Sequence, residues 1–255
     1  MHNLAAFVSG RYEVMKESWN GINLEIYYHP GHTYNLGKMM EGMKKSIELY
    51  SELYGPYQYR QCRIIEFPYG SYAASFPNTI PFSENIGFIL DVDPDDPEDL
   101  DMPFWVTAHE MGHQWWPHQV AGGAVQGSGF LSEGLSEYSA VTLLEKEKGA
   151  KQLGKFLRYE MKRYLSGRAA ETRFEPTIME TEGQGYIHYN KAGLLLYSLR
   201  DLIGEESMHR ALGRFIEKHR YQEAPYTNIG ELVDEIRSET PEELQYLSLI
   251  HISEP

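Results

Sequence analysis

The stretch His109-Glu110-Met111-Gly112-His113 decides how this sequence is interpreted. Two histidines four residues apart lie on one face of a helix, where their ring nitrogens can bind one Zn²⁺ ion at about 2.0–2.1 Å. Glu110 lies beside the first histidine and can take a proton from a metal-bound water without being a ligand itself. The plain alternative is a helix that carries two surface histidines, and the residues around the motif decide between the two.

The residues before the motif predict a helix over about 102–116. Asp101 can cap its N-terminus, Pro103 suits its first turn, and Phe104–Val106 continue an apolar face into the motif. The motif therefore lies inside a helix, as shared metal binding by its two histidines requires.

A catalytic zinc site also needs a third protein ligand and one open position. One class of zinc enzyme uses a third histidine six residues after the second, with a glycine between them. Here those two places hold Gln119 and Trp116, and His118 is one residue off. A carboxylate on the next helix is the other option, and we expect Glu133 to be this ligand. Glu137, one turn later, is then either a group that supports the ligands or a solvated carboxylate.

Composition narrows the class of protein. The chain has 255 residues, with 37 Asp and Glu against 23 Lys and Arg, for a formal charge of −14. This charge repels phosphate backbones, so we expect no nucleic-acid partner, and no basic cluster suggests contact of this segment with a membrane. A single cysteine excludes an intrachain disulfide, whereas ten histidines leave a metal site open.

The hydrophobic pattern predicts an α+β fold with a small sheet followed by a mainly helical second half. Residues 11–18 and 22–28 flank an Asn-Gly turn and read as a hairpin. A helix over 34–53 and strands over 61–67 and 86–91 follow. Further helices are predicted at about 133–148, 151–166, 189–203, 205–220, 227–238 and 240–246.

Four segments of the sequence resemble, in the same order, those of the gluzincin aminopeptidases of the aminopeptidase N type. That family has a thermolysin-like catalytic domain, an HExxHxW core, an Asn-Glu-Gly third-ligand segment, a Gly-x-Met-Glu-Asn signature and a Tyr-Glu-Lys-Gly segment. The matching segments here are Ser83-Glu84-Asn85, His109–Trp116, Ser132-Glu133-Gly134 and Tyr189-Asn190-Lys191.

The resemblance implies a role for each matching residue. His109, His113 and Glu133 would hold one Zn²⁺ ion per chain, and Glu110 would be the catalytic base. The substrate would be a peptide with a free N-terminus, whose α-amine Glu84 would bind as a carboxylate.

The resemblance also implies a group that stabilises the oxyanion of the tetrahedral intermediate. Tyr189 takes this role, and Tyr186 and His188 are its alternatives. Two other functions stay open: a gluzincin endopeptidase in which Glu84 reads no amine, and a catalytically silent zincin-fold interaction domain. Glu110 argues against the silent domain, because a structural zinc site has no use for it.

The sequence departs from the family pattern in places. Pro81 and Ser83 replace the Gly and Met of the signature, and the spacer from His113 to Glu133 is one residue longer than usual. We expect the Gly-rich connector Gly122–Gly129 to absorb that residue.

Residues 69–72, 75–81 and 114–119 look most like bacterial membrane proteins that fuse such a peptidase to an ABC-transporter permease. We therefore expect a fragment of a parent protein that is membrane-associated in a bacterium. Its predicted parts are a hairpin remnant of a preceding β domain (1–29), the catalytic domain (30–246) and a non-native tail (247–255) that resembles translated sequencing-adapter read-through.

Overall fold

The structure is a computed structural model that describes residues 8–68, 70–93, 95–96 and 98–246. Its sheet has four strands in the order β1-β2-β3-β4, the first pair antiparallel and the other two pairs parallel. The strands are β1 Glu13–Trp19, β2 Ile22–Tyr28, β3 Gln61–Phe67 and β4 Thr79–Ser83. The predicted tail 247–255 lies outside the described residues.

The predicted hairpin is confirmed, and it belongs to the main sheet. Asn20 and Gly21 have positive φ angles of 49° and 78° and form its turn. Leu24 and Ile26 of β2 are completely buried, and β2 pairs with β3. Whether a further β domain precedes the hairpin in a longer protein stays a prediction.

The strand predicted over 86–91 is wrong, and β4 lies just before it. Residues 84–88 form turns, after which the chain bends, with hydrogen bonds from Gly87 N to Ser83 O and from Ile89 N to Glu84 O. Phe88 is buried against Phe82, which explains the apolar pattern without a strand. The sequence did not indicate β4 because it contains Pro81, and proline is rare inside sheets.

The helical prediction is confirmed in outline. The long helices carry apolar faces into one shared core, and short 3₁₀ or π-helical turns separate several of them. In chain order the elements are α1 Leu36–Tyr54, α2 Met102–Gly112, η1 Phe130–Gly134, α3 Leu135–Ala170, η2 Ile178–Glu180, η3 Tyr186–Lys191, α4 Ala192–Ile203, α5 Glu205–His219, α6 Ile229–Glu239 and η4 Glu242–Leu244.

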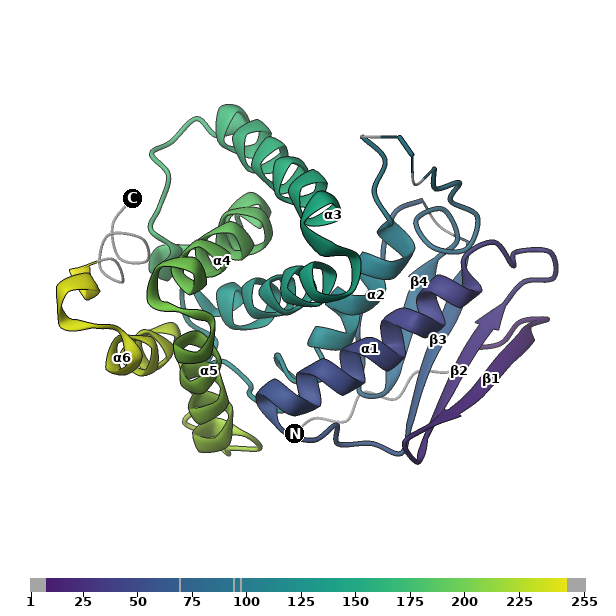
Figure 1. Cartoon of the computed structure of the whole chain (residues 1–255), viewed down its shortest axis with the longest axis horizontal. Coiled ribbons are helices and arrows are strands. Elements are labelled where there is room, and N and C mark those ends of the chain that lie inside the picture. Colours follow the sequence, from purple (N-terminus) through teal and green to yellow (C-terminus); the bar gives the residue numbers. More distant parts are fainter. Residues whose placement is uncertain (1–7, 69, 94, 97, 247–255) are drawn as a thin grey trace.

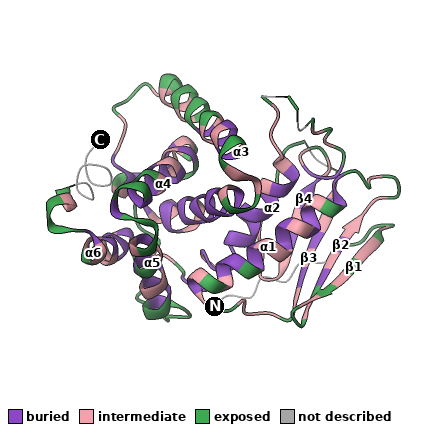
Figure 2. Cartoon of the chain, viewed as in Figure 1, coloured by how far each residue is buried: buried purple, intermediate pink, exposed green. Residues whose placement is uncertain are grey.

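α3 joins the two helices that were predicted at 133–148 and 151–166. Gly149 has φ 75° and ψ 176°, a backbone conformation that favours glycine, and the helix changes direction there. Figure 2 shows the first half of α3 buried among the other helices and the second half with one exposed side. The second half therefore projects from the core.

α1 lies between the sheet and the rest of the helices (Figure 1). It packs against α2, and α2 packs in turn against α3. The centre of the molecule is thus α2, with the sheet and α1 on one side and the helical half on the other. None of the described helices is long and apolar enough to cross a membrane.

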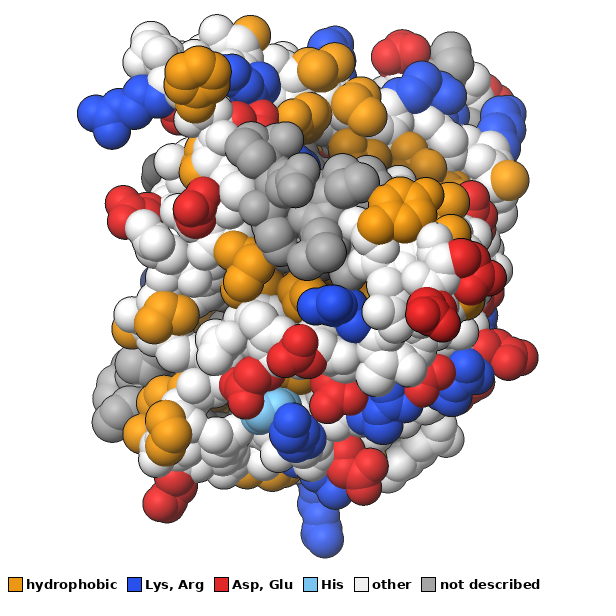
Figure 3. All heavy atoms as spheres, turned by 90° about the vertical axis from the view of Figure 1, so that its left-hand side faces the viewer, with side chains coloured by type: hydrophobic (Ala, Val, Ile, Leu, Met, Phe, Trp, Pro, Cys, Tyr) orange, Lys and Arg blue, Asp and Glu red, His pale blue; other side chains and the backbone are white. Residues whose placement is uncertain are grey.

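On the face that contains α6, the acidic and basic side chains of the described residues are intermingled (Figure 3). Ion pairs between α5 and α6 account for part of this mixture: Arg214 pairs with Glu235 and Glu239, and Arg210 also pairs with Glu239. These partly exposed pairs link α6 to α5, and each contributes little to stability.

Candidate metal centre

Three side chains converge where α2 meets the start of α3. The Nε2 atoms of His109 and His113 lie 3.3 and 3.2 Å from Oε2 of Glu133. A tetrahedral zinc ion with ligands at about 2.1 Å separates its ligand atoms by about 3.4 Å. The three donors therefore already have the spacing of a zinc site, and they are the residues expected from the sequence.

The far nitrogen of each ring is held by its own hydrogen bond. Nδ1 of His109 donates to Oε2 of Glu137 at 2.9 Å, and Nδ1 of His113 donates to the Trp116 carbonyl at 2.6 Å. Ser136 Oγ also lies 2.9 Å from Nδ1 of His113. Because these bonds place the proton on Nδ1, each Nε2 keeps its lone pair free for a metal. Glu137 is 1% exposed and so supports His109 instead of facing solvent.

Two glycines allow the helices to approach this closely. A Cβ atom on Gly112 would lie 3.0 Å from the Cα atom of Ser136, so any other residue would push α2 away from α3. A Cβ atom on Gly193 of α4 would lie 2.6 Å from Cγ of Glu137. The glycine inside the HExxH motif therefore sets the distance between the two histidines and the Glu133 segment.

The site opens into a cavity of about 500 Å³. Glu110 lines it, is 5% exposed, and its Oε2 atom has no hydrogen-bond partner among the described residues. Burial raises the pKa of Glu110, and the neighbouring His113 and His109 oppose this shift. A carboxylate that is buried beside the metal donors and has one oxygen unpaired among the described residues is suited to accept a proton.

Of the three oxyanion candidates, only Tyr189 lines the cavity. Its ring stacks on His109 with centroids 5.7 Å apart, and burial and the Glu133 carboxylate hold its pKa above the ordinary value, so the hydroxyl stays a donor. Tyr186 lines a different cavity. His188 packs against Gly129, where a Cβ atom would lie 2.5 Å from its Nδ1.

Glu84 does not line the cavity of the metal centre. It directly follows β4, and its carboxylate lies with His29, His32 and Glu66 in a separate group. The edge of the cavity is formed instead by residues 71–75, which run antiparallel to β4. The structure therefore offers no support for Glu84 as the residue that binds the substrate's amine.

Sequence reasoning missed a carboxylate that does line the cavity. Glu160, on the second half of α3, is 1% exposed, and its Oε2 accepts a hydrogen bond from Nδ2 of Asn190 at 2.7 Å. Its Oε1 has no partner among the described residues. Burial, together with the charge of Glu137, raises the pKa of Glu160 to about 8. No local motif marks this residue, because the bend at Gly149 is what brings it back to the site.

A model of the peptidase family M1 domain matches residues 38–248. The chain belongs to peptidase family M1. It is therefore a zinc metallopeptidase domain, and the His109, His113 and Glu133 donors have the spacing that zinc needs.

Solved M1 structures share the fold over almost the whole chain. The M1 zinc metallopeptidase from Deinococcus radiodurans is 16% identical, with a TM-score of 0.70 over 96% of this chain and 52% of that one. A mutant of it bound to a Tyr-Ser-Ala substrate is 15% identical, with a TM-score of 0.70 and coverage of 95% and 52%. A two-domain M1 zinc metallopeptidase mutant bound to L-tryptophan is 15% identical, with a TM-score of 0.67 and coverage of 96% and 52%.

The chain spans about half the length of these M1 structures. A comparison with curated protein sequences found no match. The fold is that of an M1 domain, whereas the roles of the individual site residues and the fusion to a permease stay predictions.

Proposed function

We propose that this M1 domain is a zinc-dependent aminopeptidase that removes N-terminal residues from peptides. The observation that carries the proposal is the unpaired, buried carboxylate of Glu110 beside three zinc donors in an open cavity. A structural metal site would need no such group. The M1 structure with a bound tripeptide supports a peptide as the class of substrate.

Each residue of the metal centre would have a separate role in the hydrolysis of the peptide bond. His109, His113 and Glu133 would hold zinc, which supplies the Lewis acidity that polarises a carbonyl and acidifies a water molecule. Glu110 would accept the proton of the attacking water and pass it to the leaving amine. Tyr189 would donate its hydroxyl hydrogen to the oxyanion as that charge develops.

We assign recognition of the free N-terminus to Glu160 in place of Glu84. The cavity is lined by four carboxylates (Glu110, Glu133, Glu137 and Glu160) against one guanidinium, Arg163. A substrate ammonium entering beside Glu160 would pair with its free oxygen and favour its ionised form. A peptide with a blocked N-terminus would bring no ammonium to the free oxygen of this buried carboxyl group and would leave that oxygen unpaired, which costs binding energy.

The test compares amino-acid amides and short peptides with free and with acetylated N-termini. We expect kcat/KM to be at least about 100-fold higher for the free substrates, because a buried polar group is left unpaired by the blocked ones. Equal rates would identify an endopeptidase and contradict the proposal.

A variant separates Glu160 from the rest of the site. Glu160→Gln is expected to lower kcat/KM for free substrates by about 100-fold while leaving the slow rate on acetylated ones unchanged. Glu223→Gln, at an exposed position, is the control and should behave as wild type. An equal loss on both substrates would assign Glu160 to packing instead.

A further inference from the structure

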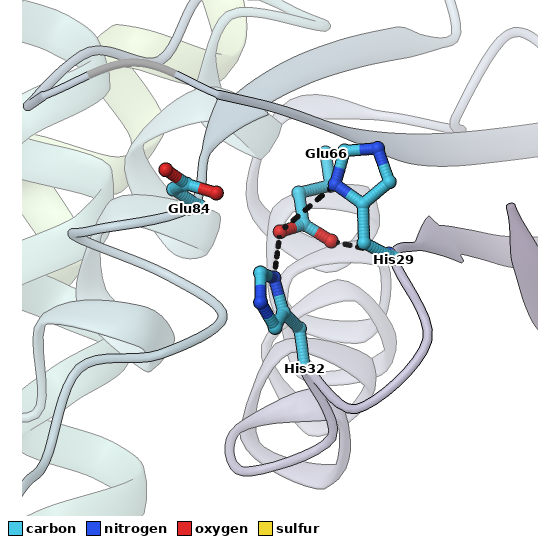
Figure 4. Close-up of side chains that lie close together, drawn as sticks. All are labelled: His29, His32, Glu66 and Glu84. Atoms are coloured by element: carbon cyan, nitrogen blue, oxygen red, sulfur yellow. Dashed lines mark hydrogen bonds and ion pairs between the residues drawn. The ribbon is translucent and has the colours of Figure 1, made fainter. Parts of the chain in front are cut away.

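A second group of metal-ligating side chains lies at the edge of the sheet, apart from the catalytic cavity. His29, His32, Glu66 and Glu84 each offer one ligand atom, and all four atoms lie within 4.8 Å of one another. None of these residues lines the cavity of the M1 centre. Figure 4 shows the two imidazoles and the two carboxylates turned toward a common space.

The parallel strands explain why these four residues meet. Tyr27 of β2 is paired with Ile65 of β3, and Phe67 of β3 is paired with Ser83 of β4. Because parallel strands end at the same edge of a sheet, the residues that follow them are neighbours. His29 lies just past β2, Glu66 lies near the end of β3, and Glu84 directly follows β4. His32 joins them from the loop that leads into α1.

The centre of the group is a carboxylate with no access to solvent. Glu66 is 0% exposed, and its Oε1 lies 2.5 Å from Nδ1 of His32 and 3.5 Å from Nδ1 of His29. Its Oε2 accepts a hydrogen bond from the backbone N–H of His29 at 2.5 Å. A tyrosine ring, that of Tyr12, stacks on His29 with centroids 5.1 Å apart and covers one side.

Charge is the feature that points to a cation. Glu84 faces Glu66 across the gap, and two carboxylates this close repel each other unless a cation lies between them. In the part of the chain that the structure describes, no Lys or Arg forms an ion pair with either carboxylate. One divalent cation would balance the charge of two carboxylates completely.

We propose that His29, His32, Glu66 and Glu84 bind a second zinc ion, with a structural role. Two imidazole nitrogens and two carboxylate oxygens suit zinc, whereas Ca²⁺ and Mg²⁺ prefer oxygen ligands alone. Ligand atoms about 3.4 Å apart fit a tetrahedral ion. The separation between His29 and Glu66 is already close to this value, and His32 needs to move outward by about 1 Å. Four protein ligands leave no open position, so the site holds structure and performs no chemistry.

The second site is linked to the catalytic cavity through the hydrogen bonds of β4. Ser83, next to Glu84, donates its N–H to the carbonyl of Tyr72 at 2.8 Å, and Ala74 N donates to Pro81 O at 3.1 Å. Tyr72 and Ala74 line the cavity. A metal at Glu84 therefore fixes the strand that supports the cavity edge.

The experiment measures zinc per chain in the purified protein. Wild type is expected to contain two equivalents, the His109→Gln/His113→Gln double variant one, and addition of His32→Gln to that double variant none. His209→Gln, a half-buried histidine of α5 outside both groups, is the matched control and should keep two. One equivalent in wild type, or no effect of His32→Gln, overturns the proposal.

X-ray absorption identifies the ligands of the zinc that remains, so the test does not depend on the zinc content alone. The double variant has lost both imidazole donors of the catalytic group, so its remaining zinc should show two imidazole and two oxygen ligands. Adding excess zinc should raise its Tm by about 5 °C or more, as expected for a ligand at about 100 times its Kd. A zinc without imidazole ligands, or an unchanged Tm, contradicts the second site. Neither readout depends on peptidase activity.

Discussion

The two His/Glu groups of this molecule are assembled in different ways. In the catalytic group, two ligands come from one helical segment, and the third follows 20 residues later on η1. In the sheet-edge group, four ligands come from three segments, the β2–α1 loop, β3 and the residue after β4, which meet because three strands are parallel. A metal site on one helix can be recognised from the spacing of its ligands in the sequence. A metal site at a sheet edge can be recognised only when the order and direction of the strands are known.

The surroundings of the two groups differ as much as their assembly. The catalytic group faces a cavity and has beside it Glu110, whose Oε2 has no hydrogen-bond partner in the described part of the chain. In the sheet-edge group both oxygens of Glu66 already have partners. Three ligands with a free base are arranged for a reaction, and four ligands without one are arranged for rigidity.

The largest expected effect is a loss of activity, because only the catalytic His/Glu group has a base beside it. Glu110→Gln keeps the size of the side chain but removes the base, so we expect kcat to fall by about 10⁴-fold. Zinc content should stay as in wild type, because Glu110 is not a ligand. Activity assays and metal analysis on the same sample test this, and unchanged turnover would refute the assignment of the base.

A smaller effect is expected from the oxyanion donor. Tyr189→Phe removes only a hydroxyl, and we expect kcat to fall by about 10²–10³-fold with little change in KM. Tyr186→Phe is the matched control, since it lies on the same turn but lines another cavity. A larger loss for Tyr186→Phe than for Tyr189→Phe would reverse the assignment.

The smallest expected effect concerns the hydrogen bond that Glu137 accepts from His109 in the catalytic metal site. Glu137→Gln weakens the hydrogen bond that orients His109, so zinc affinity at that site should fall by about 10- to 100-fold. Titration with a chelator should show this loss for one equivalent of zinc and leave the other unchanged. If both equivalents weaken together, the variant has disturbed the fold and the comparison fails.

The sequence predicts the parts of the molecule in which function is local. The HExxH helix, its Asp101 cap, the hairpin turn and the Glu133 donor follow from short-range patterns, and the structure contains all of them. Asp101 accepts a hydrogen bond from Phe104 N, as expected of an N-cap.

The sequence does not predict features that depend on long-range geometry. Glu84 resembles part of a signature, yet the sheet directs it to His29 and His32. Glu160 reaches the cavity because α3 bends at Gly149, which lies eleven residues before it. The strand β4 was hidden because Pro81 has no N–H and reads as a turn residue.

The π-helical turns η1 and η3 carry Glu133 and Tyr189, and each runs directly into a regular helix, α3 or α4. Such a turn contains one residue more than an α-helical turn, and each helical residue rotates the chain by about 100°. Deleting one residue from η1 would therefore produce a continuous, well-formed helix whose carboxylate points away from the histidines. At this position, the deletion of one codon would therefore be enough to turn the enzyme into an inactive protein with the same fold.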